Sequence, residues 1–244
     1  MTRSAAAMAL AAASLALVGC VPAAERTPPP APEAEPARFA PAAPIVASSA
    51  PGPLPFEERA DAAWLASTAA ATGIPERALR AYASATLVSN AENLSCGASW
   101  NTLAGMGWVE SQHGAIFDGA IGAEGTVSPK IFGVPLDGGD TANVPDSDDG
   151  AIDEDSSVDR AVGPLQLIPD TWRNWHVDAD GDGVEDLHDL DDASLAAVHY
   201  LCRAGGELST EEGWRAGILA WNRSETYLED VAARAVGYAA AASG

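Results

Sequence analysis

The prolines of this chain are crowded into one segment, and their distribution decides where a folded domain can form. Residues 21–55 hold 11 of the 17 prolines, mixed with alanine and a few charged residues. Each proline lacks the backbone N–H that donates hydrogen bonds in helices and sheets. The segment also contains few large apolar side chains, so it cannot bury enough apolar surface to form a core. We therefore expect residues 20–55 to form a disordered tether and residues 56–244 to form one domain with its own core.

The first 19 residues are typical of an export signal. Arg3 supplies a basic start, and the apolar run over residues 5–18 is too short to span a bilayer. The run ends in small residues before Cys20, which resembles the lipobox of bacterial lipoproteins. An ordinary secretory signal with an incidental cysteine is the alternative. The sequence predicts a signal peptide over residues 1–19 and an exported protein that a lipid on Cys20 anchors to the cell membrane.

The charge of the chain argues against nucleic acid as a partner. The formal net charge is −22, and residues 137–192 alone carry 18 of the 35 acidic residues. The electrostatic field of so many carboxylates repels a polyanion such as nucleic acid. The same density of carboxylates suits the binding of cations.

The folded part contains two cysteines, Cys96 and Cys202. Exported proteins usually pair an even number of cysteines, so we expect a disulfide between them. Two buried free thiols are the alternative.

The hydrophobic pattern of residues 56–244 is helical. Gly73 is a typical helix stop, and Pro75 suits the first turn of a helix. No period persists over residues 115–160, and so long a loop is usually functional. We expect a mainly α fold with helices over residues 56–73, 75–90, 100–112, 169–175, 191–204, 210–222 and 224–243.

Glu110 is the first candidate for chemistry. Leu103, Met106 and Gly107 precede it at spacings of three and four residues, which places all four on one helix face. If that face is buried, loss of hydration raises the pKa of the carboxyl toward neutrality, as a general acid requires. A solvated glutamate at a helix end is the alternative.

A second motif follows at residues 163–166, Gly-Pro-Leu-Gln, with Pro-Asp-Thr-Trp at 169–172. It predicts a tight turn before a helix. The amide of Gln166 can donate to and accept from a sugar, although a surface glutamine would look the same. Three tryptophans could stack on a sugar or simply fill the core: Trp108, Trp172 and Trp221.

The acidic stretch at residues 178–189 has the spacing of a calcium-binding loop. Aspartates occupy positions 1, 3, 5, 9 and 12 of an EF-hand-like pattern, and Gly183 stands near the turn. The predicted ligands are Asp178, Asp180, Asp182, Asp186 and Asp189, with the backbone carbonyl of Val184. We expect weak, structural calcium binding; a solvated acidic loop is the alternative. The other acidic run, at 146–159, is either a solvated loop beside the site or a second cation or gating element.

Taken in order, these runs resemble the lytic transglycosylases of the lysozyme-like superfamily, in particular the membrane-bound transglycosylase B type of actinobacteria. The resemblance covers most of residues 73–242. The runs that carry it are TGIPERALRAY, the stretch from Cys96 to Trp100, LAGMGWVESQHG, AVGPLQLIPDTW, DADGDGVEDLHDLDDASLAAVHYLC and AWNRSETYLEDV. It implies a helical domain similar to goose-type lysozyme, with long acidic loops.

The resemblance also implies roles for particular residues. Glu110 matches the only catalytic acid/base of the family, and three further residues match substrate-binding positions: Ser111, Gln166 and Asn222. Trp221 stands where the family has a tyrosine, so a phenolic hydroxyl is missing there and a hydrogen-bonding role of that position is in doubt. Stacking of Trp221 on a sugar remains possible.

The activity that the resemblance implies is cleavage of the bond between N-acetylmuramic acid and N-acetylglucosamine in peptidoglycan. The muramic 6-hydroxyl closes a 1,6-anhydro ring, no water is consumed, and catalysis needs no cofactor. The protein would face the cell wall. Two alternatives stay open: a muramidase, which uses water and a second carboxylate, and a calcium-stabilised lipoprotein that binds peptidoglycan without cleaving it.

Overall fold

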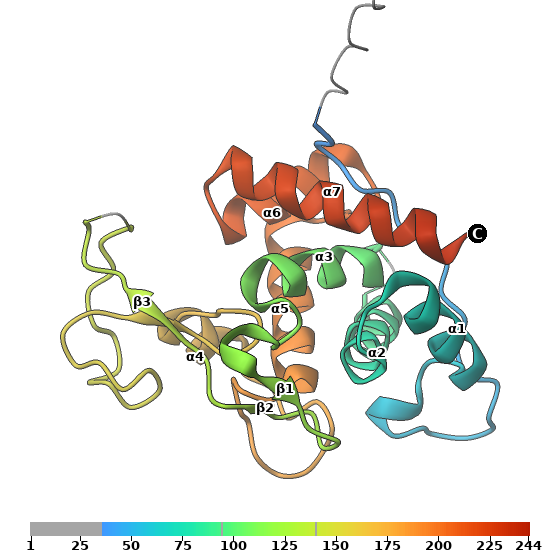
Figure 1. The fold of residues 1–244 in the computed structure, drawn as a ribbon, viewed down its shortest axis with the longest axis horizontal. Helices are drawn as coiled ribbons and strands as arrows, with labels where there is room; N and C mark the ends of the chain where they lie inside the picture. Colours follow the sequence, from blue (N-terminus) through green and yellow to red (C-terminus); the bar gives the residue numbers. More distant parts are fainter. Residues whose placement is uncertain (1–35, 94, 140) are drawn as a thin grey trace, which may run out of the picture. The chain divides into compact units, whose positions relative to one another are not determined.

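The structure is a computed structural model that describes residues 36–93, 95–139 and 141–244, so the predicted signal peptide and Cys20 lie outside the described residues. Within these ranges the chain is mainly α-helical, as predicted, and none of its helices is long and apolar enough to cross a membrane (Figure 1). The α-helices are α1 (Ala62–Thr72), α2 (Glu76–Glu92), α3 (Trp100–Ser111), α4 (Pro169–Trp175), α5 (Leu190–Gly205), α6 (Glu211–Trp221) and α7 (Glu225–Ala242). Two 3₁₀ turns are η1 (Phe56–Glu58) and η2 (Ile116–Asp118).

The predicted helix boundaries follow the capping residues. Gly73 adopts a left-handed φ of 73° directly after α1, and Pro75 precedes α2. The helix expected over residues 56–73 is divided, because the carboxylate of Asp61 accepts a hydrogen bond from the backbone N–H of Trp64 and starts α1 there. Residues 56–58 therefore form only a 3₁₀ turn.

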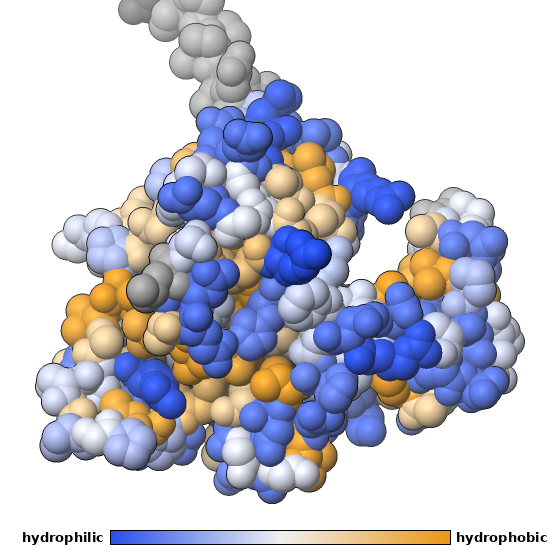
Figure 2. Space-filling model, turned by 180° about the vertical axis from the view of Figure 1, so that it is seen from behind, coloured by the Kyte–Doolittle hydropathy of each residue, from blue (hydrophilic) through white to orange (hydrophobic). Residues whose placement is uncertain are grey.

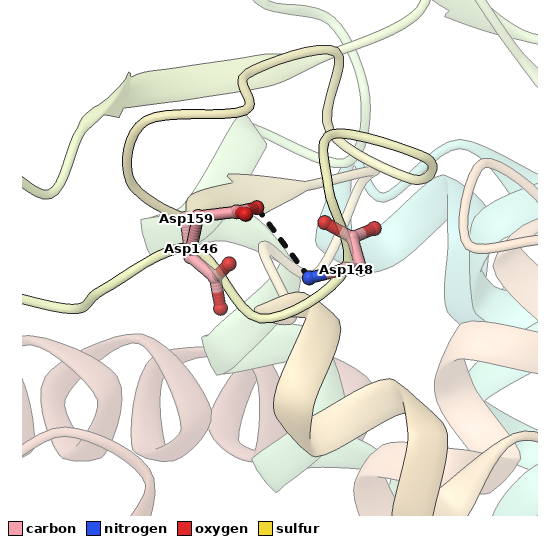
Figure 3. Close-up of side chains that lie close together, drawn as sticks. All are labelled: Asp146, Asp148 and Asp159. Atoms are coloured by element: carbon pink, nitrogen blue, oxygen red, sulfur yellow. Dashed lines mark hydrogen bonds between the residues drawn. The ribbon is translucent and has the colours of Figure 1, made fainter.

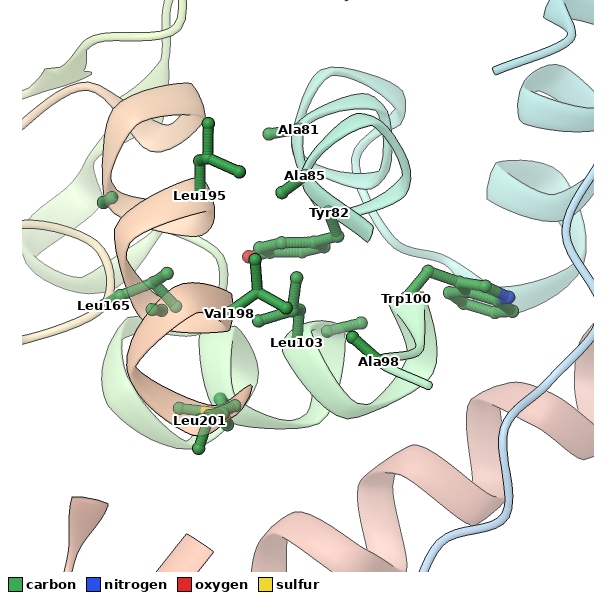
Figure 4. Packing of buried hydrophobic residues seen from close by; sticks show 14 of the residues in the cluster. Ala81, Tyr82, Ala85, Ala98, Trp100, Leu103, Leu165, Leu195, Val198 and Leu201 are labelled. Carbon is green, nitrogen blue, oxygen red and sulfur yellow. The ribbon is translucent and has the colours of Figure 1, made fainter. Parts of the chain in front are cut away.

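Helix α3 lies at the centre of the helical body and contacts α2, α5 and α7. Its first eight residues, 100–107, are all buried. Tyr82 of α2 packs beside Leu103 of α3 in this core (Figure 4). The two helices approach so closely that a Cβ on Gly107 would lie 2.0 Å from the phenolic oxygen of Tyr82. Glycine is therefore required at this point of α3.

The predicted disulfide is confirmed. Cys96, in the loop before α3, is bonded to Cys202 on α5 across a sequence separation of 106 residues. The disulfide therefore connects the loop before α3 to α5, the helix that follows the acidic loop of residues 178–189.

The folded unit begins earlier than the proline distribution predicts. It starts at Pro36 rather than at residue 56. Asn101 of α3 donates its side-chain N–H to the carbonyl of Pro41 at 3.0 Å, and Trp100 donates its indole N–H to the carbonyl of Pro44 at 3.0 Å. Proline has no backbone N–H to donate, but its carbonyl still accepts hydrogen bonds, so this segment packs on the helices with no helix of its own and with Ala47 in an isolated β-bridge to Ala60.

The long region between α3 and α4 contains short strands. The sequence does not predict them, because apolar and polar residues do not alternate there over more than a few positions. The strands are β1 (Ala120–Ile121), β2 (Val127–Ser128), β3 (Phe132–Pro135) and β4 (Arg160–Val162). They form two antiparallel pairs, β1 with β2 and β3 with β4. Residues 132–162, here called the β3–β4 lobe, project beside the helical body, and Figure 2 shows a notch between the two.

Candidate active site

Glu110 lies in the last turn of α3, where its half-buried carboxyl meets two donors from the far end of the chain. The phenolic hydroxyl of Tyr227, in the first turn of α7, donates to Oε1 at 2.5 Å. The indole N–H of Trp221, the last residue of α6, donates to the same oxygen at 3.1 Å. Among the described residues no donor reaches the other oxygen, Oε2.

Burial raises the pKa of Glu110 to about 7, although the hydrogen bonds from Tyr227 and Trp221 lower it. Both effects have a clear cause, because loss of water disfavours the charged carboxylate and the two donors favour it. Since both donors hold Oε1, the proton of the neutral acid sits on Oε2. Near neutral pH the side chain is therefore present in both its protonated and its charged form, and Oε2 is the oxygen left to meet a ligand.

The sequence pattern did not identify Tyr227. It lies 117 residues from Glu110, and only the packing of α7 along α3 brings the two together. Trp221 lacks a phenolic hydroxyl, yet its indole N–H donates a hydrogen bond to Glu110.

Two pockets adjoin Glu110 and its partners. The larger has a volume of about 640 Å³ and is lined by Trp108, Val109, Glu110, Ser111, Gln112, Ile116, Asp230, Ala233 and Arg234. The smaller has a volume of about 90 Å³ and is lined by Gln166, Leu167, Ile168, Thr171, Tyr200 and Trp221. Trp221 lines the small pocket and also bonds Glu110. Glu110 itself therefore lines the large pocket, and Trp221 links it to the small one.

Of the predicted substrate-binding residues, Gln166 and Trp221 line the small pocket, and Asn222 lines neither pocket. The backbone N–H of Asn222 caps the end of α6, and its side chain is exposed. Gln166 has a left-handed φ of 51° and donates one amide hydrogen to the carbonyl of Gly163 at 2.9 Å. That bond keeps the side chain folded back over its own turn.

Ser111 lines the large pocket, but its hydroxyl is bonded within the protein. Its hydroxyl is buried, donates to the carbonyl of Pro164 at 2.6 Å and accepts from the backbone N–H of Gly114 at 2.8 Å. The single hydroxyl proton is used within the protein, so it cannot be donated to a sugar. Ser111 instead fixes the turn that carries Gln166 to the end of α3.

The chain reverses sharply after α3, through Gln112 and His113, with left-handed φ values of 52° and 60°. Non-glycine residues rarely adopt this conformation unless their surroundings hold them there. His113 is held between two phenols: its ring nitrogens lie 3.1 Å from the hydroxyl of Tyr82 and 3.0 Å from that of Tyr238. Burial, together with the charge of Arg234, lowers the pKa of His113 to about 4, so the ring is neutral and structural.

The acidic loop brings together some of the predicted metal ligands and replaces others. Two groups of aspartates have carboxylate oxygens within 4.8 Å of one another. The groups are Asp178 with Asp180 and Asp192, and Asp180 with Asp189 and Asp191. Buried aspartate clusters of this kind can hold a cation such as Ca²⁺.

Asp182 and Asp186 stand outside both groups, contrary to the EF-hand-like spacing. Each carboxylate accepts a hydrogen bond from the backbone N–H two residues later, at 2.7 Å from Val184 and 2.8 Å from His188. Asp192, which the spacing did not include, is buried at the start of α5. Its position depends on the packing of α5, which no loop motif contains.

A third group of aspartates lies in the β3–β4 lobe, formed by Asp146, Asp148 and Asp159 (Figure 3). Asp159 is fully buried and accepts from the backbone N–H and the hydroxyl of Ser147, both at 2.8 Å. Asp148 accepts from the backbone N–H of Ile152 at 2.6 Å. Internal hydrogen bonds thus order this segment, whose residues are mostly exposed or half-buried, and both expectations for it stay open.

Comparison of the chain with protein-family models, with curated proteins and with solved structures yields no match. The candidate site rests on its own geometry.

Proposed function

We propose that this protein is a lytic transglycosylase that cleaves the bond between N-acetylmuramic acid and N-acetylglucosamine in peptidoglycan. The observation that carries the proposal is Glu110, a carboxyl whose pKa is about 7 and whose Oε1 is held by two donors. A fold similar to that of goose-type lysozyme belongs to the same proposal. So do export, the lipid anchor on Cys20 and a position facing the cell wall.

In the proposed reaction Glu110 acts first as an acid and then as a base. Oε2 donates its proton to the bridging oxygen, and the substrate's own N-acetyl group supports the cationic sugar centre. The resulting carboxylate is stabilised by Tyr227 and Trp221, whose hydrogen bonds favour the charged form. It then takes the proton of the muramic 6-hydroxyl as the anhydro ring closes. A pKa near the working pH serves both steps.

One observation favours a second candidate, a hydrolytic muramidase. Asp230 lines the same large pocket as Glu110, so a second carboxylate is available to activate water. Asp230 lies on α7, outside both acidic stretches of the sequence.

Product analysis separates these functions. Purified peptidoglycan is digested with the full-length chain, and the products are identified by mass spectrometry. Anhydromuramic ends that persist in Asp230→Asn support the transglycosylase. Reducing muramic ends that disappear in Asp230→Asn support the muramidase. Binding to the sacculus without any cleavage would favour the binding lipoprotein.

We also propose that Ca²⁺ binds the group formed by Asp178, Asp180 and Asp192 and stabilises the acidic loop. Burial raises the pKa of Asp192 to about 7, and neighbouring carboxylates add to the rise, so a cation would relieve this crowding. The other group is less suited, because Asp191 already forms a bidentate ion pair with Arg77 at 2.9 and 2.6 Å. The site would hold the loop in place and take no part in catalysis.

Removing calcium is expected to lower the Tm by about 5 °C, since an extracellular-type site saturated with ligand stabilises by about 2–3 kcal/mol. Differential scanning calorimetry with calcium and with chelator measures the difference. Asp180→Asn, which belongs to both groups, should lose the response. Glu185→Gln is the matched control, because Glu185 lies in the same loop and pairs with His176 instead. An unchanged Tm in wild type would show that the loop needs no cation.

A further inference from the structure

Arg234 projects from α7 into the large pocket that Glu110 lines. Its guanidinium carbon lies 4.3 Å from the ring centroid of Trp108 on α3. Stacking of this kind attracts the cation to the ring face and limits its motion. The side chain is thereby held in position beside the catalytic acid.

Arg234 differs from most other arginines of the described residues because it forms no ion pair with a carboxylate. Within the part of the chain that the structure describes, six arginines form ion pairs with carboxylates within 4.0 Å, namely Arg38, Arg77, Arg80, Arg160, Arg173 and Arg215. Among the described residues Arg234 has neither a carboxylate nor any other hydrogen-bond acceptor. Asp230, one helical turn earlier, lines the pocket without pairing with it. Although the chain has a net charge of −22, the guanidinium of Arg234 therefore keeps all of its N–H donors available for a ligand.

An arginine fixed by stacking presents two parallel N–H groups, a geometry that matches a carboxylate. The small pocket contains no basic residue. Of the two sugars of peptidoglycan only muramic acid bears a carboxyl group, either free on its lactyl ether or within the attached peptide stem. The large pocket thus offers a positive charge and the small pocket does not, just as muramic acid bears a carboxyl group and N-acetylglucosamine does not.

We propose that Arg234, stacked on Trp108, binds a carboxylate borne by a muramic residue and so sets the direction in which a glycan strand lies across Glu110. The inference rests on the proposed function, because it names the group that the large pocket recognises on the same substrate. Arg234 determines specificity and is distinct from the catalytic acid.

The test compares the full-length wild type with Arg234→Gln and Arg234→Lys on three substrates: strands with peptide stems, strands freed of stems, and stem-free strands whose carboxyls have been converted to amides. We expect kcat/KM of Arg234→Gln to fall at least about tenfold on a carboxylate-bearing substrate, with partial recovery in Arg234→Lys. On the amidated strands wild type and Arg234→Gln should be equal. A loss confined to stem-bearing strands assigns the carboxylate to the stem, and a loss on stem-free strands assigns it to the lactyl group.

Arg203→Gln is the control for a general loss of positive charge, because Arg203 lines neither pocket beside Glu110. Equal rates for wild type and Arg234→Gln on every substrate would overturn the inference, and so would an equal loss on amidated strands. Calorimetric binding of stem-free and stem-bearing strands to Glu110→Gln, with and without Arg234→Gln, keeps the two proposals apart. If wild type cleaves nothing but binding weakens about tenfold without Arg234, the proposed function fails and the carboxylate site stands. If binding is unchanged, the inference fails.

Discussion

Replacing Glu110 by glutamine is expected to lower the rate of peptidoglycan cleavage by about 10³-fold, because the glutamine amide has no proton acidic enough to protonate the bridging oxygen. The variant should remain folded. The glutamine Oε1 can still accept from Tyr227 and Trp221, the two donors of the site. The measurement is the rate of release of soluble muropeptides from purified sacculi.

The pH dependence of the wild type should identify the same group. The first step requires protonated Glu110, so activity should fall as the pH rises above about 7, the pKa of the folded state. An activity that persists in Glu110→Gln, or that stays level between pH 7 and 9, would contradict the role of Glu110 as the acid.

Glu110→Gln should also stabilise the domain in alkaline solution. The pKa is about 7 in the folded state and 4.5 in a freely hydrated chain, so between these values the folded state holds a proton that the unfolded state has released. The free energy of unfolding of wild type therefore decreases through this window and levels off above pH 7. The variant lacks this loss, and above pH 7 it should be more stable by about 2–3 kcal/mol. Equal stability of the two proteins at pH 8 would show that Glu110 carries no desolvation cost.

Removal of the disulfide is expected to destabilise the domain by about 4 kcal/mol and to lower its Tm by about 10 °C. Cys96 and Cys202 close a loop with a sequence separation of 106 residues, and freeing it raises the conformational entropy of the unfolded chain. Urea unfolding of the double variant Cys96→Ala/Cys202→Ala measures the change. The loss should appear in the free energy of unfolding, while the chemistry at Glu110 is retained below the new Tm.

Reduction of the wild type is the matched comparison for the double variant. A reductant should lower the wild-type Tm toward that of the variant and leave the variant unchanged. A wild type whose Tm is insensitive to complete reduction would show that the bond contributes little to stability.

The acidic loop shows where pattern-based inference reaches its limit. The spacing at residues 178–189 correctly indicated that carboxylates gather there, because alternate residues in a tight loop lie close together whatever surrounds them. It includes Asp182 and Asp186, which lie outside the two groups of close carboxylates. It missed Asp192, which reaches the group from α5. The two sets differ because a loop pattern carries no information about the helix that packs against it.

The sequence by itself determined the mainly helical character of the chain, most helix ends, the cysteine pair and Glu110 as the residue of interest. These follow from local chemistry: periodic apolar residues, a left-handed glycine after a helix, and an acid on an apolar face. Only the tertiary structure decided that residues 36–55 belong to the folded unit, that Ser111 faces Pro164, and that Tyr227 and Trp221 hold one oxygen of Glu110. Each of these facts is a contact between segments far apart in sequence, and such contacts depend on how the helices pack.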